Sequence, residues 1–202
     1  MGELFDITSK DSLFGQDSFE KAESMLQKIA VVEAIKKVNK TAGDIDCIFA
    51  GDLLNQCIGS SFGLRDLGIS FCGLYGACST MALSLINAAI FLEAGAADTA
   101  IAVTSSHFCS AERQYRFPLE YGSQRTPTAQ WTVTGSGAVL LNKENNKVYI
   151  DKAMLGKIFD LGVKDANNMG AAMAPDDVKI RPYPKLEGMV FFYTQIQYLR
   201  GF

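Results

Sequence analysis

The chain has 202 residues and a mass of 21.9 kDa, enough for one domain with a sizeable core. Hydrophobic residues make up 48% of it and charged residues 20%, which excludes a largely disordered chain. The formal net charge of −3 argues against a nucleic-acid surface, which needs a basic excess, so we expect no nucleic-acid partner.

Cysteine and histidine usage argues against a metal site. The chain has five cysteines, no C-x-x-C pair and a single histidine, so we expect neither zinc nor any other cofactor. Free thiols without an N-terminal signal peptide indicate a reducing compartment, and we expect a cytoplasmic chain. The longest apolar run, residues 81–92, is too short to span a bilayer.

Helical and strand patterns alternate through the first half of the chain. Residues 17–39 carry apolar side chains at three- and four-residue spacing, which predicts a helix, with Asp17 at the N-cap position. Residues 77–94 are apolar on nearly all sides, which predicts a fully buried helix. The full order of predicted elements is helix 17–39, strand 47–50, helix 60–67, strand 69–74, helix 77–94 and strand 99–104. This α/β alternation predicts a mostly parallel sheet with crossover helices.

The remaining segments have weaker patterns. Residues 1–16 are short and polar and predict a loop. Residues 132–141 and 147–155 read as two strands joined by a polar turn. The segment 175–202 is richer in aromatic residues and prolines than the rest. We therefore divide the chain into a domain over 1–174 and a tail over 175–202, which we expect to make few contacts with that domain.

The sharpest chemical signal is Cys78, which follows a strand and a glycine turn and stands at the start of an apolar helix. Free N–H groups at a helix N-terminus favour a thiolate, so Cys78 is a candidate nucleophile. The same N–H groups can instead hold a carboxylate ligand. A third interpretation is a small cysteine packed in the core, which is the position that we expect for Cys47 and Cys72 within their predicted strands.

Four polar residues follow other predicted strands, and these are Asp52, Asn55, Ser106 and His107. Strand carboxyl ends in open α/β sheets meet at a ligand crevice, so we expect these residues and Cys78 around one crevice. Against this, Asp and Asn favour turns for their own reasons, and a loop histidine is most often structural. The arginines of the irregular segment 111–131, Arg113, Arg116 and Arg125, offer bidentate partners for a carboxylate, and local pattern does not choose among them.

Several strings together resemble the stage V sporulation protein AD family. They are Ala50–Gln56 (AGDLLNQ), Gly76–Thr80 (GACST), Thr104–His107 (TSSH), Ala111–Gln114 (AERQ), Thr132–Ala138 (TVTGSGA) and the run from Asp160 to Pro175. This family is similar in fold to thiolases and ketoacyl synthases, and the resemblance implies one half of their duplicated fold. Cys78 matches the position of the thiolase nucleophile. Family chains extend further at both ends, so we expect this chain to be a fragment.

The resemblance also carries functional expectations. It implies binding of dipicolinic acid, a small aromatic dicarboxylate, and its uptake into the developing spore with other stage V sporulation A proteins at the spore membrane. From their positions at the helix start and the strand ends, the residues that we expect to bind this ligand are Cys78, His107, Ser106, Asn55 and Asp52. A peripheral position at the forespore membrane and a homodimer follow from the same likeness. Two alternatives remain open: an acyltransferase with Cys78 as nucleophile, in which His107 is the available base, and an inactive fragment with an exposed apolar face.

Overall fold

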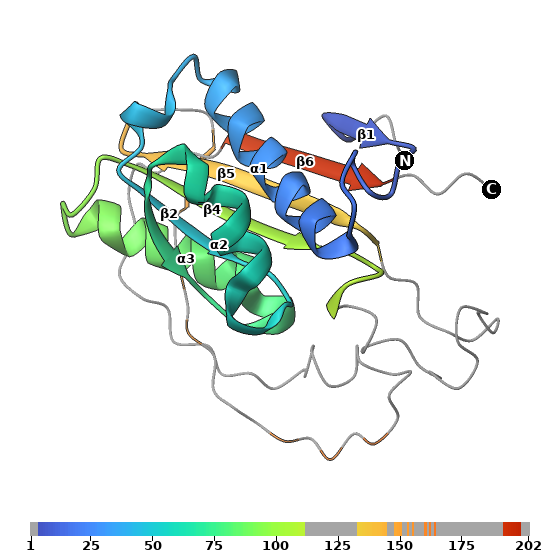
Figure 1. The fold of residues 1–202 in the computed structure, drawn as a ribbon. Helices are drawn as coiled ribbons and strands as arrows, with labels where there is room; N and C mark the ends of the chain where they lie inside the picture. Colours follow the sequence, from blue (N-terminus) through green and yellow to red (C-terminus); the bar gives the residue numbers. More distant parts are fainter. Residues whose placement is uncertain are drawn as a thin grey trace.

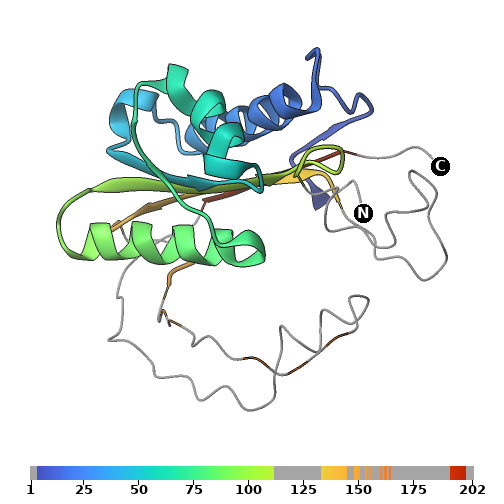
Figure 2. The same cartoon turned by 60° about the horizontal axis from the view of Figure 1, so that its bottom comes forward.

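The structure, a computed structural model, describes residues 4–111, 133–144 and 148–150, the backbone of 192–198, and five single residues between 153 and 164. Its centre is a six-stranded sheet in the order β1-β6-β5-β4-β2-β3 (Figure 1). The strands are β1 (Ile7–Ser9), β2 (Cys47–Gly51), β3 (Ser70–Gly73), β4 (Thr99–Ser106), β5 (Gly135–Asn142) and β6 (Phe192–Tyr198). The helices are α1 (Phe19–Lys37), α2 (Ile58–Leu64) and α3 (Thr80–Glu93). Figure 2 shows α1 and α2 on one face of the sheet and α3 on the other.

The sheet is mixed, with its parallel part where the sequence predicts alternation. β2 pairs in parallel with both β3 and β4, and β1 pairs in parallel with β6. The pairs β4–β5 and β5–β6 are antiparallel. Because β2, β3 and β4 are joined through α2 and α3, the predicted α/β class with crossover helices is confirmed.

Helix α1 has one buried stripe and a hydroxyl cap. Its N-cap is Ser18, whose hydroxyl oxygen accepts a hydrogen bond from the backbone N–H of Lys21 at 3.2 Å. The prediction of Asp17 as the cap is wrong by one residue, and Asp17 instead forms an exposed ion pair with Lys21 at 2.8 Å. Both residue types cap helices well, so local composition does not separate them. The buried residues of the stripe are Ala22, Glu23, Leu26, Gln27, Ala30, Val31, Ala34 and Ile35.

Side-chain alternation along the strands creates two separate cores. On β2, Ile48 and Ala50 pack under α1, whereas Phe49 packs under α3. On β4, Ile101 lies on the α1 side and Ala102 on the α3 side. Successive strand residues point to opposite faces, so each strand contributes to both cores. The same alternation continues to the strand ends, where it decides which polar residues share a face.

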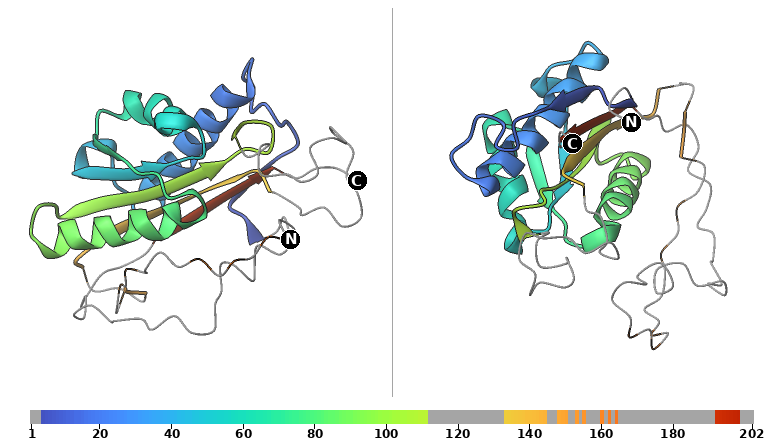
Figure 3. Two further views of the ribbon diagram at one scale, coloured as in Figure 1. Left: turned by 90° about the horizontal axis from the view of Figure 1, so that it is seen from below. Right: turned by 90° about the vertical axis from the view of Figure 1, so that its right-hand side faces the viewer.

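Helix α3 is not buried on all sides. Its buried positions are Thr80, Ser84, Ala88, Ala89 and Leu92, which form one stripe against the sheet. The large side chains of Ile90 and Phe91 are exposed. The prediction of a fully buried helix is therefore wrong. Figure 3 shows the reason, because α3 has the sheet on one side only among the described elements.

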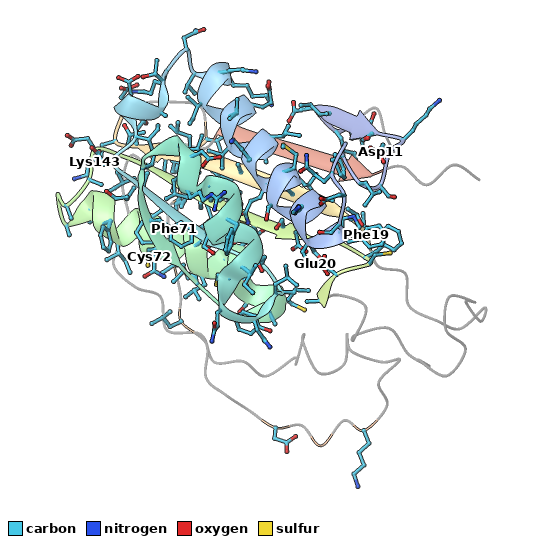
Figure 4. The ribbon with its side chains drawn as sticks, in the orientation of Figure 1. Asp11, Phe19, Glu20, Phe71, Cys72 and Lys143 are labelled. Atoms are coloured by element: carbon cyan, nitrogen blue, oxygen red, sulfur yellow. The ribbon has the colours of Figure 1, made fainter. Side chains whose placement is uncertain are left out.

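The edge strand β3 is also more open than a core strand. All four of its residues are exposed, and Figure 4 labels Phe71 and Cys72 on it. Cys72 was expected in the core, and this expectation is wrong because no strand of the described chain covers the outer edge of β3. Cys47, on the neighbouring β2, is half-buried.

The C-terminal segment contributes a strand to the sheet. β6 lies between β5 and β1 and pairs with both, with Ile196 opposite Ser136 on one side and Ile7 on the other (Figure 1). The expectation that residues 175–202 make few contacts with the domain is therefore wrong for 192–198. The short strand β1 was likewise not predicted, since 1–16 read as a loop. Residues 148–150, within the predicted strand 147–155, are not in a strand.

Candidate functional site

The turn that carries Cys78 lies between the edge strand β3 and helix α3. Three residues of 3₁₀ helix, η5 (Ala77–Ser79), lead directly into α3. The carbonyl oxygen of Gly76 accepts hydrogen bonds from the Ser79 backbone N–H at 2.9 Å and from the Ser79 hydroxyl at 2.7 Å. The Cys78 side chain is exposed. The structure thus places Cys78 at the predicted end of the helix, in the turn that immediately precedes it.

Unusual backbone conformations gather around this turn. Ala77 has a φ of +47°, in the left-handed region that alanine rarely adopts. Gln56 and Cys57, in the loop after β2, have φ values of +61° and +53°. The two loops touch, because the Cys57 thiol donates a hydrogen bond to the carbonyl oxygen of Leu74 at 3.3 Å. Such conformations persist only where the surroundings hold them, and they gather at functional sites.

Gly51, the last residue of β2, lies directly beneath the Cys78 turn. A Cβ atom at this position would lie 2.2 Å from the carbonyl oxygen of Leu74 and 2.4 Å from Cγ2 of Thr80. The backbone N–H of Leu74 also donates to the carbonyl oxygen of Ala50 at 2.8 Å. Only glycine permits this close approach, so contact with the end of β2 sets the distance between the turn and the sheet.

Asp52 is buried, with 2% of its surface exposed, and its carboxylate organises the start of α2. One carboxylate oxygen accepts hydrogen bonds from the backbone N–H and the hydroxyl of Ser60, at 2.7 and 2.6 Å. The other accepts the backbone N–H of Leu54 at 2.8 Å. The carboxylate therefore faces the α2 layer and accepts backbone N–H groups from the loop between β2 and α2 and from α2 itself.

His107 is fully buried on the α1 side. Its Nδ1 accepts the backbone N–H of Cys109 at 3.1 Å, so the ring proton resides on Nε2 and is donated to the carbonyl oxygen of Ser12 at 2.8 Å. The ring stacks with Phe108 and contacts Phe19, each at 5.2 Å between centroids, and Figure 4 labels Phe19 at the start of α1. Both ring nitrogens serve the fold, which leaves this histidine poorly placed as a base for Cys78.

The five predicted site residues therefore divide between the two faces of the sheet. Asp52 and His107 point into the α1–α2 layer, whereas Cys78 lies directly before α3, which covers the other face. Ser105 points toward α1, so the next residue, Ser106, points by strand alternation toward the α3 side and is half-buried. The expectation of a single crevice is wrong for Asp52 and His107, because a step of one residue along a strand reverses the face.

Asn55 stays at the edge with Cys78. It is exposed in the short 3₁₀ helix η3 (Asn55–Cys57), beside the Cys57 thiol that bonds to Leu74. Of the predicted residues, Cys78 and Ser106 therefore lie on the α3 side of the sheet, and Asn55 is exposed in the loop that contacts the Cys78 turn. The arginines Arg113, Arg116 and Arg125 lie outside the described residues.

A buried polar network, which the sequence analysis missed, fills the α1 side. The Gln27 amide donates to the carbonyl oxygen of Gly51 at 3.2 Å and to the hydroxyls of Ser60 and Ser105 at 3.1 and 3.3 Å. Glu23 accepts the hydroxyls of Ser105 and Ser110. The available signal was a pair of polar residues four apart on the apolar stripe of a helix. The network links the carboxyl ends of β2 and β4 on the face of the sheet opposite α3.

The thiols differ in environment. Burial, with smaller contributions from Asp46 and Cys72, raises the pKa of Cys47 to about 11. Burial, followed by the Asp52 carboxylate, also raises the pKa of Cys57. Both are therefore protonated at neutral pH and unsuited to nucleophilic chemistry. Cys78 and Cys72 are the exposed thiols of the described chain.

Comparison with known proteins assigns the family. The model of the stage V sporulation protein AD family matches residues 1–182. The chain belongs to the stage V sporulation protein AD family. The match extends past residue 175, where the resemblance read from the sequence ended. The stage V sporulation protein AD of Bacillus subtilis is 45% identical over 175 residues, which are 87% of this chain and 52% of that protein. The chain thus spans about half the length of this curated relative.

Solved structures support the thiolase-like fold. The 3-oxoacyl-[acyl-carrier-protein] synthase III of Aquifex aeolicus matches 66% of this chain and 43% of its own, with 17% identity and a TM-score of 0.51. The corresponding synthase III of Thermus thermophilus matches 80% of this chain and 50% of its own, with 17% identity and a TM-score of 0.49. At such identity the likeness concerns the fold alone, and the first of the two carries it. No helix within the described part of the chain is long and apolar enough to cross a membrane.

Proposed function

We propose that this chain binds dipicolinic acid at the α3 side of the sheet edge, beside Cys78. Membership of the stage V sporulation protein AD family indicates a role in sporulation. In this proposal the protein takes part in moving dipicolinic acid into the developing spore, together with other stage V sporulation A proteins at the spore membrane. The observation that carries the proposal is the exposed Cys78 turn at the N-terminus of the 14-residue helix α3.

The chemistry of the ligand suits this position. Dipicolinic acid carries two carboxylates on a pyridine ring, and a carboxylate at a helix N-terminus gains about 0.3–2 kcal/mol. Each charge-assisted hydrogen bond adds about 1.5–3 kcal/mol, and Ser106 and Asn55 offer such groups at the same edge. After association costs, a few of these interactions give micromolar affinity, about −8 kcal/mol.

Asp52 and His107 have a supporting role in this proposal. The Asp52 carboxylate holds the loop that carries Asn55, and the His107 ring anchors the segment that follows Ser106. In this proposal, Cys78, Ser106 and Asn55 make the direct contacts with the ligand. An acyltransferase reaction at Cys78 is the weaker reading, because His107 points to the opposite face of the sheet.

Calorimetric titration tests the proposal. Dipicolinic acid added to this chain in metal-free buffer should give micromolar binding, and picolinic acid, which has one carboxylate, should bind at least about tenfold more weakly. Ser106→Ala should weaken binding, whereas Cys72→Ser on the edge strand should not. The Bacillus subtilis relative, titrated in parallel, shows whether the rest of the longer protein is needed. Covalent acylation of Cys78 by an acyl thioester, with turnover and no heat from dipicolinic acid, would establish the enzyme instead.

A further inference from the structure

Thr80, the first residue of α3, closes the turn that carries Cys78. It is 4% exposed. Its hydroxyl accepts the backbone N–H of Gly76 at 3.1 Å and donates to the carbonyl oxygen of Ala77 at 2.8 Å. Its own backbone N–H donates to the same carbonyl. One side chain therefore joins the beginning of the turn to the beginning of the helix.

The methyl group of Thr80 ties the same turn to the sheet. Its Cγ2 atom would lie 2.4 Å from a Cβ atom at Gly51, so it packs directly on the end of β2. The two branches of this side chain have separate partners: the hydroxyl holds the turn and the methyl holds the strand. Serine retains the first contact and valine retains the second.

Ala77 explains why the turn needs holding. Its left-handed conformation places Cβ close to the following carbonyl oxygen and is unfavourable for any residue but glycine. We propose that Thr80 is a positioning residue, whose hydroxyl maintains Ala77 in this conformation and so fixes Cys78 at the N-terminus of α3. The importance of that position for a ligand rests on the proposed function, but the conformational claim does not.

Three variants separate this role from general stability. Thr80→Val removes the two hydroxyl hydrogen bonds and keeps the methyl contact, while Thr80→Ser keeps the hydrogen bonds. Ser84→Ala is the matched control, because Ser84 lies one turn further along the same buried stripe and its hydroxyl has no hydrogen-bond partner among the described residues. The readouts are hydrogen exchange of the Gly76 amide, relative to the amides of α3, and titration with dipicolinic acid.

The expected result is local. In Thr80→Val the Gly76 amide should exchange about tenfold faster or more, while the α3 amides change little, and dipicolinic acid should bind about fivefold more weakly or worse. Thr80→Ser and Ser84→Ala should stay within about twofold of the wild type in both readouts. If Thr80→Val does not fold, Thr80→Ala is measured in the same way.

The following outcomes would contradict either the positioning role of Thr80 or the proposed function. An unchanged Gly76 exchange rate in Thr80→Val, or equal acceleration in Thr80→Ser or Ser84→Ala, would overturn the positioning role. If the wild type does not bind dipicolinic acid but Gly76 exchange follows the expected pattern, the proposed function fails and the positioning role of Thr80 stands.

Discussion

The predicted site residues are buried on one face of the sheet and at least partly exposed on the other. Four polar residues on the α1–α2 side are buried, and each forms hydrogen bonds within that layer. They are Glu23, Gln27, Asp52 and His107. On the α3 side, the Cys78 turn is exposed at the same edge of the sheet. Figure 2 shows the sheet between these regions, with α1 and α2 on one face and α3 on the other. Hydrogen bonds between buried polar groups stabilise a fold, whereas a helix N-terminus open to solvent can receive a ligand.

The difference shows that nearness to a strand end is not enough to define a site. Ser105 and Ser106 are adjacent, yet Ser105 donates to the buried Glu23 and Ser106 faces the other layer. The predictions below test which parts of the two faces are structural and which are accessible. The expected effects decrease from the first prediction to the last.

The largest effect should come from Asp52→Ala. It leaves the half-buried backbone N–H group of Leu54 and the buried one of Ser60 without their acceptor, which costs about 2–4 kcal/mol of unfolding free energy. Cys78→Ala, at the exposed turn, should change stability by about 0.5 kcal/mol or less. Urea unfolding of both variants measures the difference. Equal destabilisation by the two would remove the distinction between the faces.

The thiols should separate by reactivity. At pH 8 the pKa of about 11 leaves Cys47 almost wholly protonated, and alkylation requires the thiolate. Cys47 should therefore react with iodoacetamide about a hundredfold more slowly than Cys78 or Cys72, both of which are exposed. Peptide mass spectrometry over a time course gives each rate. Comparable rates for Cys47 and Cys78 would show that the α3 layer opens readily over the start of β2.

Close packing of α1 on α2 should make Gly63→Ala destabilising. A Cβ atom there would lie 2.5 Å from the backbone carbonyl oxygen of Ser24, which cannot move without shifting α1. We expect a loss of about 1–3 kcal/mol. Gly43→Ala is the control, since its Cβ would meet only the Thr41 hydroxyl at an ordinary 3.7 Å. Thermal unfolding followed by circular dichroism compares the two, and equal midpoints would contradict the packing argument.

The smallest effect concerns Asp46, which lies just before β2. Its carboxylate contacts the start of β4 and the end of the loop that precedes β4. It accepts the backbone N–H groups of Asp98 and Thr99, and these bonds, Thr99 first, hold the pKa of Asp46 below its usual 3.8. A lowered pKa gives stability that is present above the unfolded value and lost as the pH falls through the folded value. Because the carboxylate is largely exposed, Asp46→Asn should cost about 0.5 kcal/mol or less at pH 7. The difference from wild type should shrink as the pH falls below the usual 3.8 and the carboxylate becomes protonated, and a constant difference down to pH 2 would exclude the linkage.

The fold was largely accessible from the sequence. Apolar spacing identifies α1, and short apolar runs identify β2 and β4, because these elements are long or strongly patterned. Residues 191–199 fit either a strand or a short helix, and the place of β6 in the sheet was missed because its partners, β1 and β5, are remote in the chain or too short to show a period. The pairing of Ile7 with Ile196 leaves no local trace.

The site was accessible only in part. The order strand, glycine, cysteine and helix locates Cys78 correctly, since the chemistry of a helix start is local. The face to which each strand-end residue points depends on register, and an uncertainty of one residue in a boundary reverses it. His107 and Ser106 are neighbours in the chain for which this single step decides the layer. Nothing in the sequence indicates that His107 finds its partners at Ser12 and Cys109.

The central claim, that the α3 side of this edge receives the ligand, is tested most directly by protection of thiols. The wild-type chain is alkylated with iodoacetamide with and without saturating dipicolinic acid, and the rates at Cys78 and Cys72 are read from the same digest. Both thiols are exposed, and Cys72 on the edge strand serves as the internal reference. We expect dipicolinic acid to slow alkylation of Cys78 about tenfold, as occupancy of a micromolar site requires, and to leave Cys72 unchanged. Equal rates at Cys78 with and without the ligand, under conditions in which calorimetry shows binding, would place the ligand elsewhere and contradict the account.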